Sequence, residues 1–278
     1  MIISYLHIKR KLPYVNIPFG KDLGGAKSQM KLYGLLGKTL EHSFSKQYFT
    51  QKFDSQGLTD CEYRLFEIDD ISKIKNVIAQ NPNIEGLNVT IPYKESVIPF
   101  LDELDKSAEE VGAVNVIKIK GKKLIGYNSD IYGFEKSLQK WLKVIDKSLP
   151  LQSFILGTGG AAKGVYHVLK KQKGEVYFVS RDSKMRCFDY GDFDFYLKSC
   201  KSPILIVNTT PLGTFPNVTE KPKFDYKRLK NNALLFDLVY NPDTTAFMQE
   251  GINQKCEVKN GLEMLQLQAE KAWDIWNK

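Results

Sequence analysis

Apolar positions along the chain follow two spacings, one typical of strands and one typical of helices. Short continuous apolar runs, such as Leu151 to Leu156 and Ile204 to Val207, predict strands that are buried on both faces. Apolar residues three and four positions apart predict amphipathic helices over 131–142 and Leu262–Trp276. The two patterns alternate from Lys31 onward, which predicts an α/β protein with parallel pairing and a doubly wound sheet.

Turn-forming and helix-capping residues set the limits of several predicted elements. The first helix begins near Ser43 or Ser45 and stops at Gly57, and Asn81-Pro82 ends the second. A hairpin is expected to turn at Gly121, and Gly174 is expected to end the helix through Lys171. The remaining predicted elements are strands at Lys31–Gly37, Cys61–Leu65, Ile84–Val89, Glu175–Val179 and Ala233–Val239, helices over Ser43–Asp54 and Ile71–Ile78, and hairpin strands at Ala113–Ile119 and Lys123–Tyr127.

Residues 1–29 fit neither pattern. We expect Met30 to be the natural start and the preceding stretch to be a poorly ordered extension. An ordered strand from Ile2 to Ile8 is the alternative. The N-terminus lacks the charged region and the cleavage site of a signal peptide. No apolar run reaches the roughly 18 residues that a membrane span requires, so we expect a cytoplasmic protein with no membrane contact.

Composition excludes several classes of site. The four cysteines are widely separated, and the three histidines are scattered. Neither spacing suits a metal site or a hydrolase triad, and free thiols in a reducing compartment are expected. The net charge is +8, and residues 1–29 hold five basic residues against one acidic residue, a net +4. This distribution favours a solvated surface over a nucleic-acid site and would suit anionic ligands.

A glycine-rich turn between a predicted strand and a predicted helix indicates a nucleotide site. Gly157-x-Gly159-x-x-Ala162 matches the dinucleotide fingerprint, in which small residues let backbone N–H groups approach a pyrophosphate. Ser180 and Arg181 follow the next predicted strand, where an NAD site would place an acidic residue. A hydroxyl and a guanidinium suit a 2′-phosphate, so NADP is favoured, although Asp182 complicates that preference.

Lys94 and Asp130 are candidates for proton transfer. Lys94 follows the strand Ile84–Val89, near Asn88 and Thr90, and Asp130 follows Asn128-Ser129. A ketone that accepts a hydride becomes an alkoxide and needs a proton, which a lysine beside a carboxylate can supply. The alternatives are a solvated lysine and an aspartate that only caps the helix 131–142.

Two further polar groups follow predicted strands at their carboxyl ends. Asn208-Thr209-Thr210 comes after Ile204–Val207, and Tyr240-Asn241-Pro242 comes after the strand ending at Val239. Ligands of open α/β sheets bind at these ends, whereas a simple turn is the competing interpretation.

Several motifs, in this order, give the chain a family resemblance from Lys31 to about Lys278. The motifs are HSFSK, NVTIPYK, GAVNVI, YNSDIYGF, LGTGGAAKG, NTTPLG, DLVYNP and NGLEMLQLQ. The sequence resembles the shikimate dehydrogenase family, whose members reduce 3-dehydroshikimate to shikimate in aromatic amino-acid biosynthesis. The succession NVTIPYK, AVN and NSD is the specific part of this resemblance.

The resemblance implies two α/β domains with the active site in the cleft between them. It implies a substrate domain of residues 30–130 plus 261–278 and a Rossmann-like NADP-binding domain of residues 131–260. Lys94 and Asp130 would form the acid–base pair. The implied substrate ligands are Ser43 and Ser45 for the carboxylate, Thr90, Asn115 and Gln268 for the ring hydroxyls, and Tyr240 in the cleft. The implied cofactor residues are Gly157, Gly159, Gly160, Ala161, Ser180, Arg181, Asn208, Thr209 and Gly261.

The sequence departs from the family pattern at two motifs. Ser180-Arg181-Asp182 replaces the usual Asn-Arg-Thr, and Ile131 replaces the glycine that usually follows Asp130. Of Gln266 and Gln268, we choose Gln268 by its distance from Gly261. The alternatives are a quinate/shikimate dehydrogenase that uses NAD and a non-catalytic nucleotide-binding regulator, with a nucleic-acid binder third. The resemblance is compatible with a monomer or a homodimer.

Overall fold

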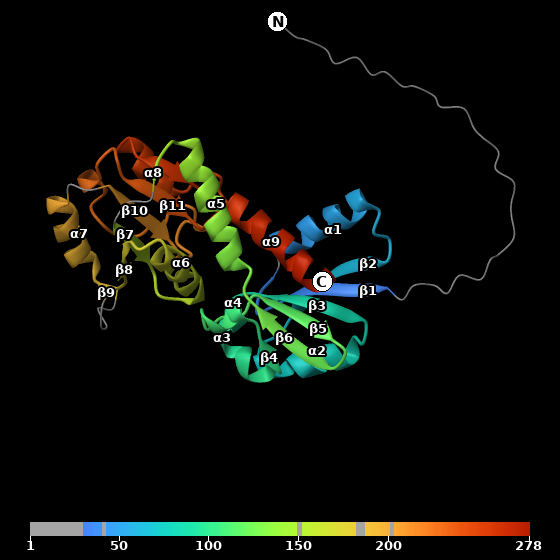
Figure 1. The fold of residues 1–278 in the computed structure, drawn as a ribbon. Coiled ribbons are helices and arrows are strands. Elements are labelled where there is room, and N and C mark those ends of the chain that lie inside the picture. The colour runs from blue at the N-terminus through green and yellow to red at the C-terminus, as the bar shows by residue number, and fades with distance from the viewer. Residues whose placement is uncertain (1–29, 41–42, 149–151, 182–186, 201–202) are drawn as a thin grey trace, which may run out of the picture.

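The described part of the chain forms two lobes, each built around a six-stranded sheet (Figure 1). The computed structural model describes residues 30–40, 43–148, 152–181, 187–200 and 203–278. The predictions for residues 1–29, Leu151 and Asp182 therefore lie outside the described residues. Both lobes alternate strands with helices, so the predicted α/β class with two domains is confirmed.

The first sheet has the strand order β2-β1-β3-β5-β6-β4 and is mixed. The pairs β2/β1, β1/β3 and β6/β4 are parallel, whereas β3/β5 and β5/β6 are antiparallel. The predicted hairpin is confirmed, with Gly121 at φ 62°. The strands are β1 (Lys31–Gly37), β2 (Cys61–Glu67), β3 (Ile84–Val89), β4 (Glu103–Leu104), β5 (Val116–Lys120) and β6 (Lys123–Tyr127).

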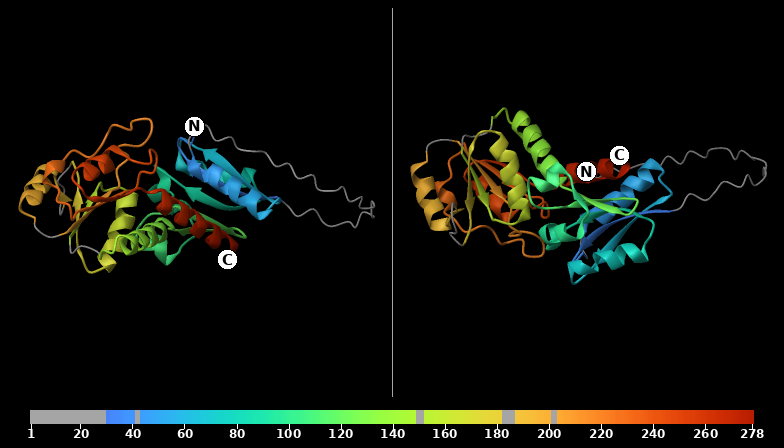
Figure 2. Two further views of the ribbon diagram at one scale, coloured as in Figure 1. Left: turned by 90° about the horizontal axis from the view of Figure 1, so that it is seen from above. Right: turned by 60° about the horizontal axis from the view of Figure 1, so that its bottom comes forward.

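Helices cover both faces of the first sheet. Side chains alternate along β1, so Leu32 and Leu36 pack on one face and Tyr33 and Leu35 on the other. The C-terminal helix α9 packs on the second of these faces beside α1, far in sequence from the strands that it covers (Figure 2). The helices of this lobe are α1 (Phe44–Gln56), η1 (Ile71–Lys73), α2 (Ile74–Gln80), α3 (Tyr93–Ser96), η2 (Ile98–Phe100), α4 (Lys106–Glu109) and α9 (Leu262–Asn277).

The second sheet is parallel throughout and has the order β12-β11-β10-β7-β8-β9. The order reverses between β7 and β10, as in doubly wound dinucleotide-binding sheets. Helices α5 and α6 cover one face, and α7 and α8 cover the other. The elements are α5 (Asp130–Val144), β7 (Gln152–Leu156), α6 (Gly160–Lys171), β8 (Glu175–Val179), β9 (Cys187–Phe188), α7 (Tyr190–Ser199), β10 (Ile204–Asn208), η3 (Tyr226–Arg228), β11 (Leu234–Asp237), α8 (Ala246–Asn253) and β12 (Glu257–Lys259).

One predicted helix stop is corrected. Lys173, and not Gly174, takes the left-handed conformation after α6, with φ 59°. The exposed Lys173 can adopt this conformation because it is a single residue outside the helix. Short elements such as α3 and β4 were not predicted, since two to four residues carry no measurable periodicity.

Two kinds of feature are absent from the described residues. No helix among them is long and apolar enough to cross a membrane. Within the same ranges, no group of three or more His, Cys, Asp or Glu side chains is placed to hold a metal ion.

Candidate active site

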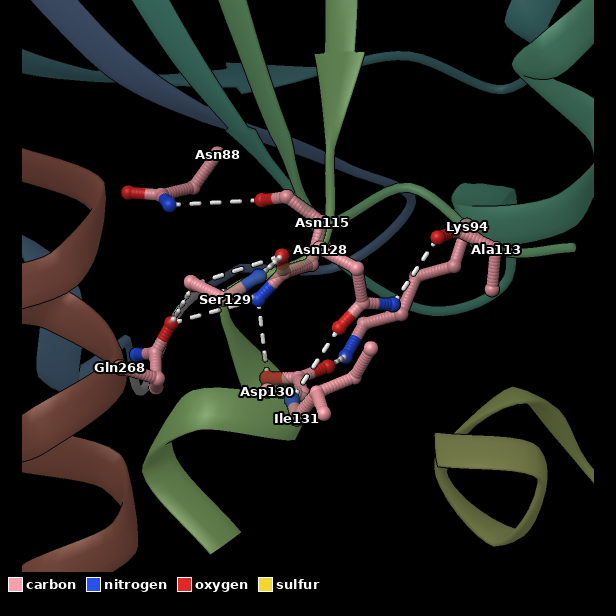
Figure 3. Close-up of polar contacts among 9 residues, drawn as sticks. All are labelled: Asn88, Lys94, Ala113, Asn115, Asn128, Ser129, Asp130, Ile131 and Gln268. Carbon is pink, nitrogen blue, oxygen red and sulfur yellow. Dashed lines mark hydrogen bonds and ion pairs between the residues drawn. The ribbon is translucent and has the colours of Figure 1, made fainter. Parts of the chain in front are cut away.

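Lys94 and Asp130 form an ion pair at the centre of the candidate site (Figure 3). The Nζ of Lys94 lies 2.7 Å from Oδ2 of Asp130. Lys94 lies on α3, which follows β3, and Asp130 is the first residue of α5, which follows β6. Their side chains are 21% and 15% exposed. The pair is therefore shielded from bulk water but still open to a ligand, and the interpretation of Lys94 as a solvated lysine is wrong.

Asn115 holds the second oxygen of the same carboxylate. Its Nδ2 donates to Asp130 Oδ1 at 2.8 Å and lies 3.4 Å from the Oε1 of Gln268 on α9. Its Oδ1 accepts a hydrogen bond of 2.7 Å from the backbone N–H of Ser129. Gln268 is buried at this cluster, whereas Gln266 is exposed. The structure thus brings Asn115, Asp130, Lys94 and Gln268 together, as the family resemblance implied.

The side chain that bonds the first turn of α5 is that of Asn128, and not that of Asp130; the N-cap residue Ser129 makes no capping side-chain bond. The Oδ1 of Asn128 accepts from the N–H of Ile131 at 3.3 Å, and its Nδ2 donates to the carbonyl of Ala113 at 2.9 Å (Figure 3). The Asp130 carboxylate instead faces Lys94 and Asn115. The alternative of a purely capping aspartate is therefore wrong, and the carboxylate remains available for chemistry.

A buried hydrogen-bond chain connects α1 to this cluster. The Tyr63 hydroxyl donates to Asn88 Oδ1 at 2.7 Å, and Asn88 Nδ2 donates to the Asn115 carbonyl at 3.3 Å. Ser45 bonds the same phenol, whose pKa is raised by burial, so Tyr63 stays a neutral donor. Ser43 caps the start of α1, and its Oγ is buried without a hydrogen-bond partner among the described residues. A free hydroxyl at a helix start can donate a hydrogen bond to a ligand anion.

Tyr240 and Thr90 lie at the borders of the site. Tyr240 follows β11 in the second lobe, and its ring meets that of Phe44 edge-on at a centroid distance of 5.7 Å. This contact brings the second lobe against the start of α1. Thr90 directly follows β3, and its N–H donates to the Leu36 carbonyl at 3.0 Å.

The glycines of the turn after β7 serve different purposes. Gly157 has φ 110°, and an added Cβ would lie 2.9 Å from Thr209 Oγ1, so the fold itself requires glycine there. Gly159 has an ordinary φ of −75°, and an added Cβ would meet nothing within 4 Å. Neither strain nor packing explains Gly159. The open space before α6 fits the close approach of a pyrophosphate to backbone N–H groups.

The predicted cofactor residues gather at one edge of the second sheet. The register pairs Leu156 of β7 with Val179 of β8 and with Asn208 of β10, so the three strands end at one level. Ser180 and the exposed Arg181 directly follow β8. Ala161 lies in the first turn of α6, after Gly160.

Asn208 and Thr209 make their polar contacts inside the protein. Asn208 is fully buried and donates from Nδ2 to Asp237 Oδ1 at 2.9 Å, while its Oδ1 accepts from Thr210 Oγ1 at 2.7 Å. Thr209 Oγ1 donates to the Leu156 carbonyl at 2.7 Å. These bonds shape the loop that borders Gly157. The predicted pair therefore lies at the correct strand end, with its side chains directed into the protein.

Asp237 was missed by the sequence reasoning. It is fully buried at the end of β11, where its carboxylate accepts from Asn208, from the Val239 N–H at 3.0 Å and from Thr245 Oγ1 at 2.6 Å. Burial raises its pKa to about 6. The acidic residue that ends the apolar run in the DLVYNP motif was the available signal.

Gly261 directly precedes α9, where the chain leaves the second lobe. An added Cβ would lie 2.1 Å from the Leu238 carbonyl oxygen, and the Gly261 N–H donates to the Val239 carbonyl at 3.1 Å. Glycine is therefore required there by the close contact of two backbone segments.

The glycine turn faces the ion pair across the two lobes. An added Cβ on Gly160 would lie 4.0 Å from the Cβ of Lys94 and 3.7 Å from that of Ala113. Beside this contact, Lys163 of α6 pairs with Glu95 of α3 at 2.6 Å. The start of α6 therefore lies next to the segment that carries Lys94.

Comparison with known proteins agrees with this geometry. Residues 35–117 match the family model described as the shikimate dehydrogenase substrate binding domain. Shikimate dehydrogenase (NADP(+)) of Methanococcus maripaludis is 34% identical over 90% of this chain and 92% of its own.

Two solved structures extend the likeness. The crystal structure of shikimate dehydrogenase 1 from Peptoclostridium difficile is 35% identical, with a TM-score of 0.74 over 89% of this chain and 92% of that chain. Shikimate 5-dehydrogenase from Thermus thermophilus, in complex with NADP(H) and shikimate, is 26% identical, with a TM-score of 0.74 over 89% of this chain and 93% of that chain. By its motifs, its fold and its near full-length likeness to these enzymes, the chain belongs to the shikimate dehydrogenase family.

Proposed function

We propose that this protein catalyses the reversible, NADP-dependent reduction of 3-dehydroshikimate to shikimate. The observation that carries the proposal is the Lys94–Asp130 pair, joined at 2.7 Å and facing the glycine turn before α6. A partly shielded ammonium next to a nucleotide cradle is what the reduction of a ketone requires. The name and ligands of the T. thermophilus relative agree with this reaction.

The acid–base work falls to Lys94 and Asp130. NADPH, when bound, supplies the hydride. Lys94 then donates a proton to the substrate oxygen, or stabilises its negative charge, as the hydroxyl forms. Asp130 holds the ammonium in place, and Asn115 fixes Asp130 through its other oxygen. In the reverse direction the same pair receives the proton of the shikimate hydroxyl.

The substrate lies among residues of the first lobe and Tyr240. Ser43 and Ser45 take the carboxylate at the start of α1, a helix of 13 residues whose N-terminus favours an anion. The Ser43 Oγ is buried and has no hydrogen-bond partner in the part of the chain that the structure describes, which supports this role. Thr90, Asn115 and Gln268 bind the ring hydroxyls.

The cofactor lies along the ends of β7, β8 and β10. The turn from Gly157 to Ala161 holds the pyrophosphate, and the open space at Gly159 supports that role. Ser180 and the exposed Arg181 take the 2′-phosphate, since a guanidinium pairs well with phosphate. Asn208 and Thr209 shape the loop along the cofactor, and Gly261 lies near the nicotinamide.

The domain limits follow from this assignment. Residues 30–130 with 261–278 make the substrate domain, which the packing of α9 on the first sheet supports. Residues 131–260 make the dinucleotide domain. We place the enzyme in the cytoplasm as a monomer or a homodimer.

An assay of purified protein tests the function. NADP+ reduction with shikimate should exceed the rates with NAD+ or quinate. Replacing Lys94 by Ala should lower turnover by about 10²- to 10⁴-fold, the usual range for a lost proton donor. Lys123→Ala is the matched control. Lys123 lies on the exposed hairpin, where it pairs with Glu103 of β4, and it should be dispensable for turnover. A Lys94→Ala enzyme with wild-type turnover would contradict the assigned role. A preference for quinate with NAD+ would favour the alternative enzyme.

A further inference from the structure

A second ion pair joins the two lobes one residue beyond Lys94. The Oε2 of Glu95 lies 2.6 Å from the Nζ of Lys163, which belongs to the first turn of α6. An added Cβ on Gly160 would lie 3.6 Å from the other oxygen of this carboxylate. One oxygen of the Glu95 carboxylate, Oε1, therefore lies close to the start of α6, and the other, Oε2, pairs with Lys163 of the same helix.

The start of α6 attracts anions. The helix has 12 residues, and its free N–H groups and dipole place partial positive charge at the glycine turn. Lys163 adds a full charge beside that turn. Glu95 and the pyrophosphate of a dinucleotide are both anions, so both are drawn to this helix end and to Lys163. When both are present, they repel each other.

We propose that Glu95 competes with the cofactor pyrophosphate for Lys163 and the start of α6. The inference rests on the proposed function, because it takes NADP as the ligand. Binding of the pyrophosphate displaces Glu95 and frees α3 from α6. Glu95 directly follows Lys94, so cofactor binding is coupled to the segment that carries the proton donor.

The size of the effect follows from the exposure of the pair. The side chains of Lys163 and Glu95 are 43% and 46% exposed, so solvent screens their attraction. A competition of this strength changes an affinity by about two- to fivefold. Glu95 therefore adjusts cofactor binding and does not prevent it.

Calorimetric titration of Glu95→Gln with NADP+ tests the competition. The variant should bind NADP+ about two- to fivefold more tightly than wild type, because the competing charge is gone. Adenosine 2′-phosphate, which lacks the pyrophosphate, should bind both proteins equally. Lys163→Gln should weaken NADP+ binding by a similar factor and leave adenosine 2′-phosphate unaffected.

Glu110→Gln is the matched control. Glu110 also reaches α6 from the first lobe, where its Oε2 lies 3.0 Å from His167 Nε2 and 3.8 Å from Lys171 Nζ, further along the helix. The Glu110→Gln substitution removes the same charge at a site away from the glycine turn, so NADP+ affinity should not change. The competition is refuted if Glu95→Gln binds NADP+ no more tightly than wild type, or if Glu110→Gln tightens it equally. Absence of NADP+ binding by the wild type would overturn the proposed function as well.

Discussion

At the scale of single residues, Asp237 and Asn115 show how buried polar groups shape the site. Each is almost fully buried and has all of its side-chain oxygens in hydrogen bonds. Such networks are stable only when every member is satisfied. Asn115 thereby orients the carboxylate of Asp130, and Asp237 fixes the strand-end loop that contains Asn208.

The raised pKa of Asp237 predicts a specific pH dependence of stability. Its pKa rises from 3.8 to about 6 through burial, so the folded state keeps this proton to higher pH than the unfolded chain does. Ionisation of Asp237 therefore lowers the free energy of unfolding as pH rises from about 4 to 6. The free energy of unfolding of Asp237→Asn relative to wild type should therefore rise as pH increases through this window, by at most about 3 kcal/mol.

Urea unfolding at several pH values measures that difference. Asp70 is the control of opposite sign, because hydrogen bonds from Ser72 lower its pKa. The ionised Asp70 stabilises the folded state at pH values above its unfolded pKa, and this contribution is lost as pH falls. The difference in free energy of unfolding between Asp70→Asn and wild type should therefore shrink in acid. If the difference in free energy of unfolding between Asp237→Asn and wild type stayed constant from pH 4 to 6.5, the account of Asp237 as a buried carboxyl would be contradicted.

At the scale of elements, the turn between β7 and α6 contains a glycine that the fold requires, Gly157, and one that it does not, Gly159. Gly157→Ala should lower the free energy of unfolding by about 1–3 kcal/mol, since a methyl group at φ 110° is strained and crowds Thr209. Gly159→Ala should leave stability within about 0.5 kcal/mol, because its site meets no strain and no neighbour.

The two glycine variants should also differ in NADP+ affinity, and here Gly159→Ala should show the clear loss. The methyl group of Gly159→Ala fills the open space before α6 and should weaken NADP+ binding at least tenfold, which is about 1.4 kcal/mol. Thermal unfolding and calorimetric titration give the two measurements. Loss of stability in Gly159→Ala with unchanged NADP+ affinity would remove this evidence for the cradle.

At the scale of the whole molecule, α9 ties the end of the chain to its first sheet. Trp276 is 6% exposed, and its Nε1 donates to the Ile117 carbonyl at 3.0 Å. An added Cβ on Gly86 of β3 would lie 2.2 Å from the Trp276 ring, so the helix lies directly on the sheet. The stability of the first lobe therefore depends on residues encoded after the second.

Trp276→Ala should destabilise the first lobe by about 3–5 kcal/mol and leave NADP+ binding by the second lobe intact. Leu197→Ala is the mirror control, since Leu197 is 2% exposed in the core of the second lobe. It should lower the unfolding temperature of that lobe and weaken NADP+ binding. Differential scanning calorimetry, together with NADP+ titration, distinguishes the effects of the two substitutions. Equal shifts of one common transition would show that the lobes unfold together.

The sequence by itself determined the features that depend on neighbouring residues. Apolar runs defined strands such as Ile84–Val89 and Glu175–Val179, and the structure confirms both with the same limits. The glycine spacing located the turn between β7 and α6, and the order of the motifs identified the family. These signals are local, because strand burial, turn conformation and helix capping act over a few residues.

The tertiary structure alone decided which distant residues meet. Asn115 and Gln268 are 153 positions apart and lie 3.4 Å apart, and no periodicity encodes that contact. The same holds for the pairing of Glu95 with Lys163 between the two lobes, whereas the placement of α9 on the first sheet follows the family resemblance. These contacts arise from the packing of whole sheets and helices, so local patterns indicate only that polar partners exist.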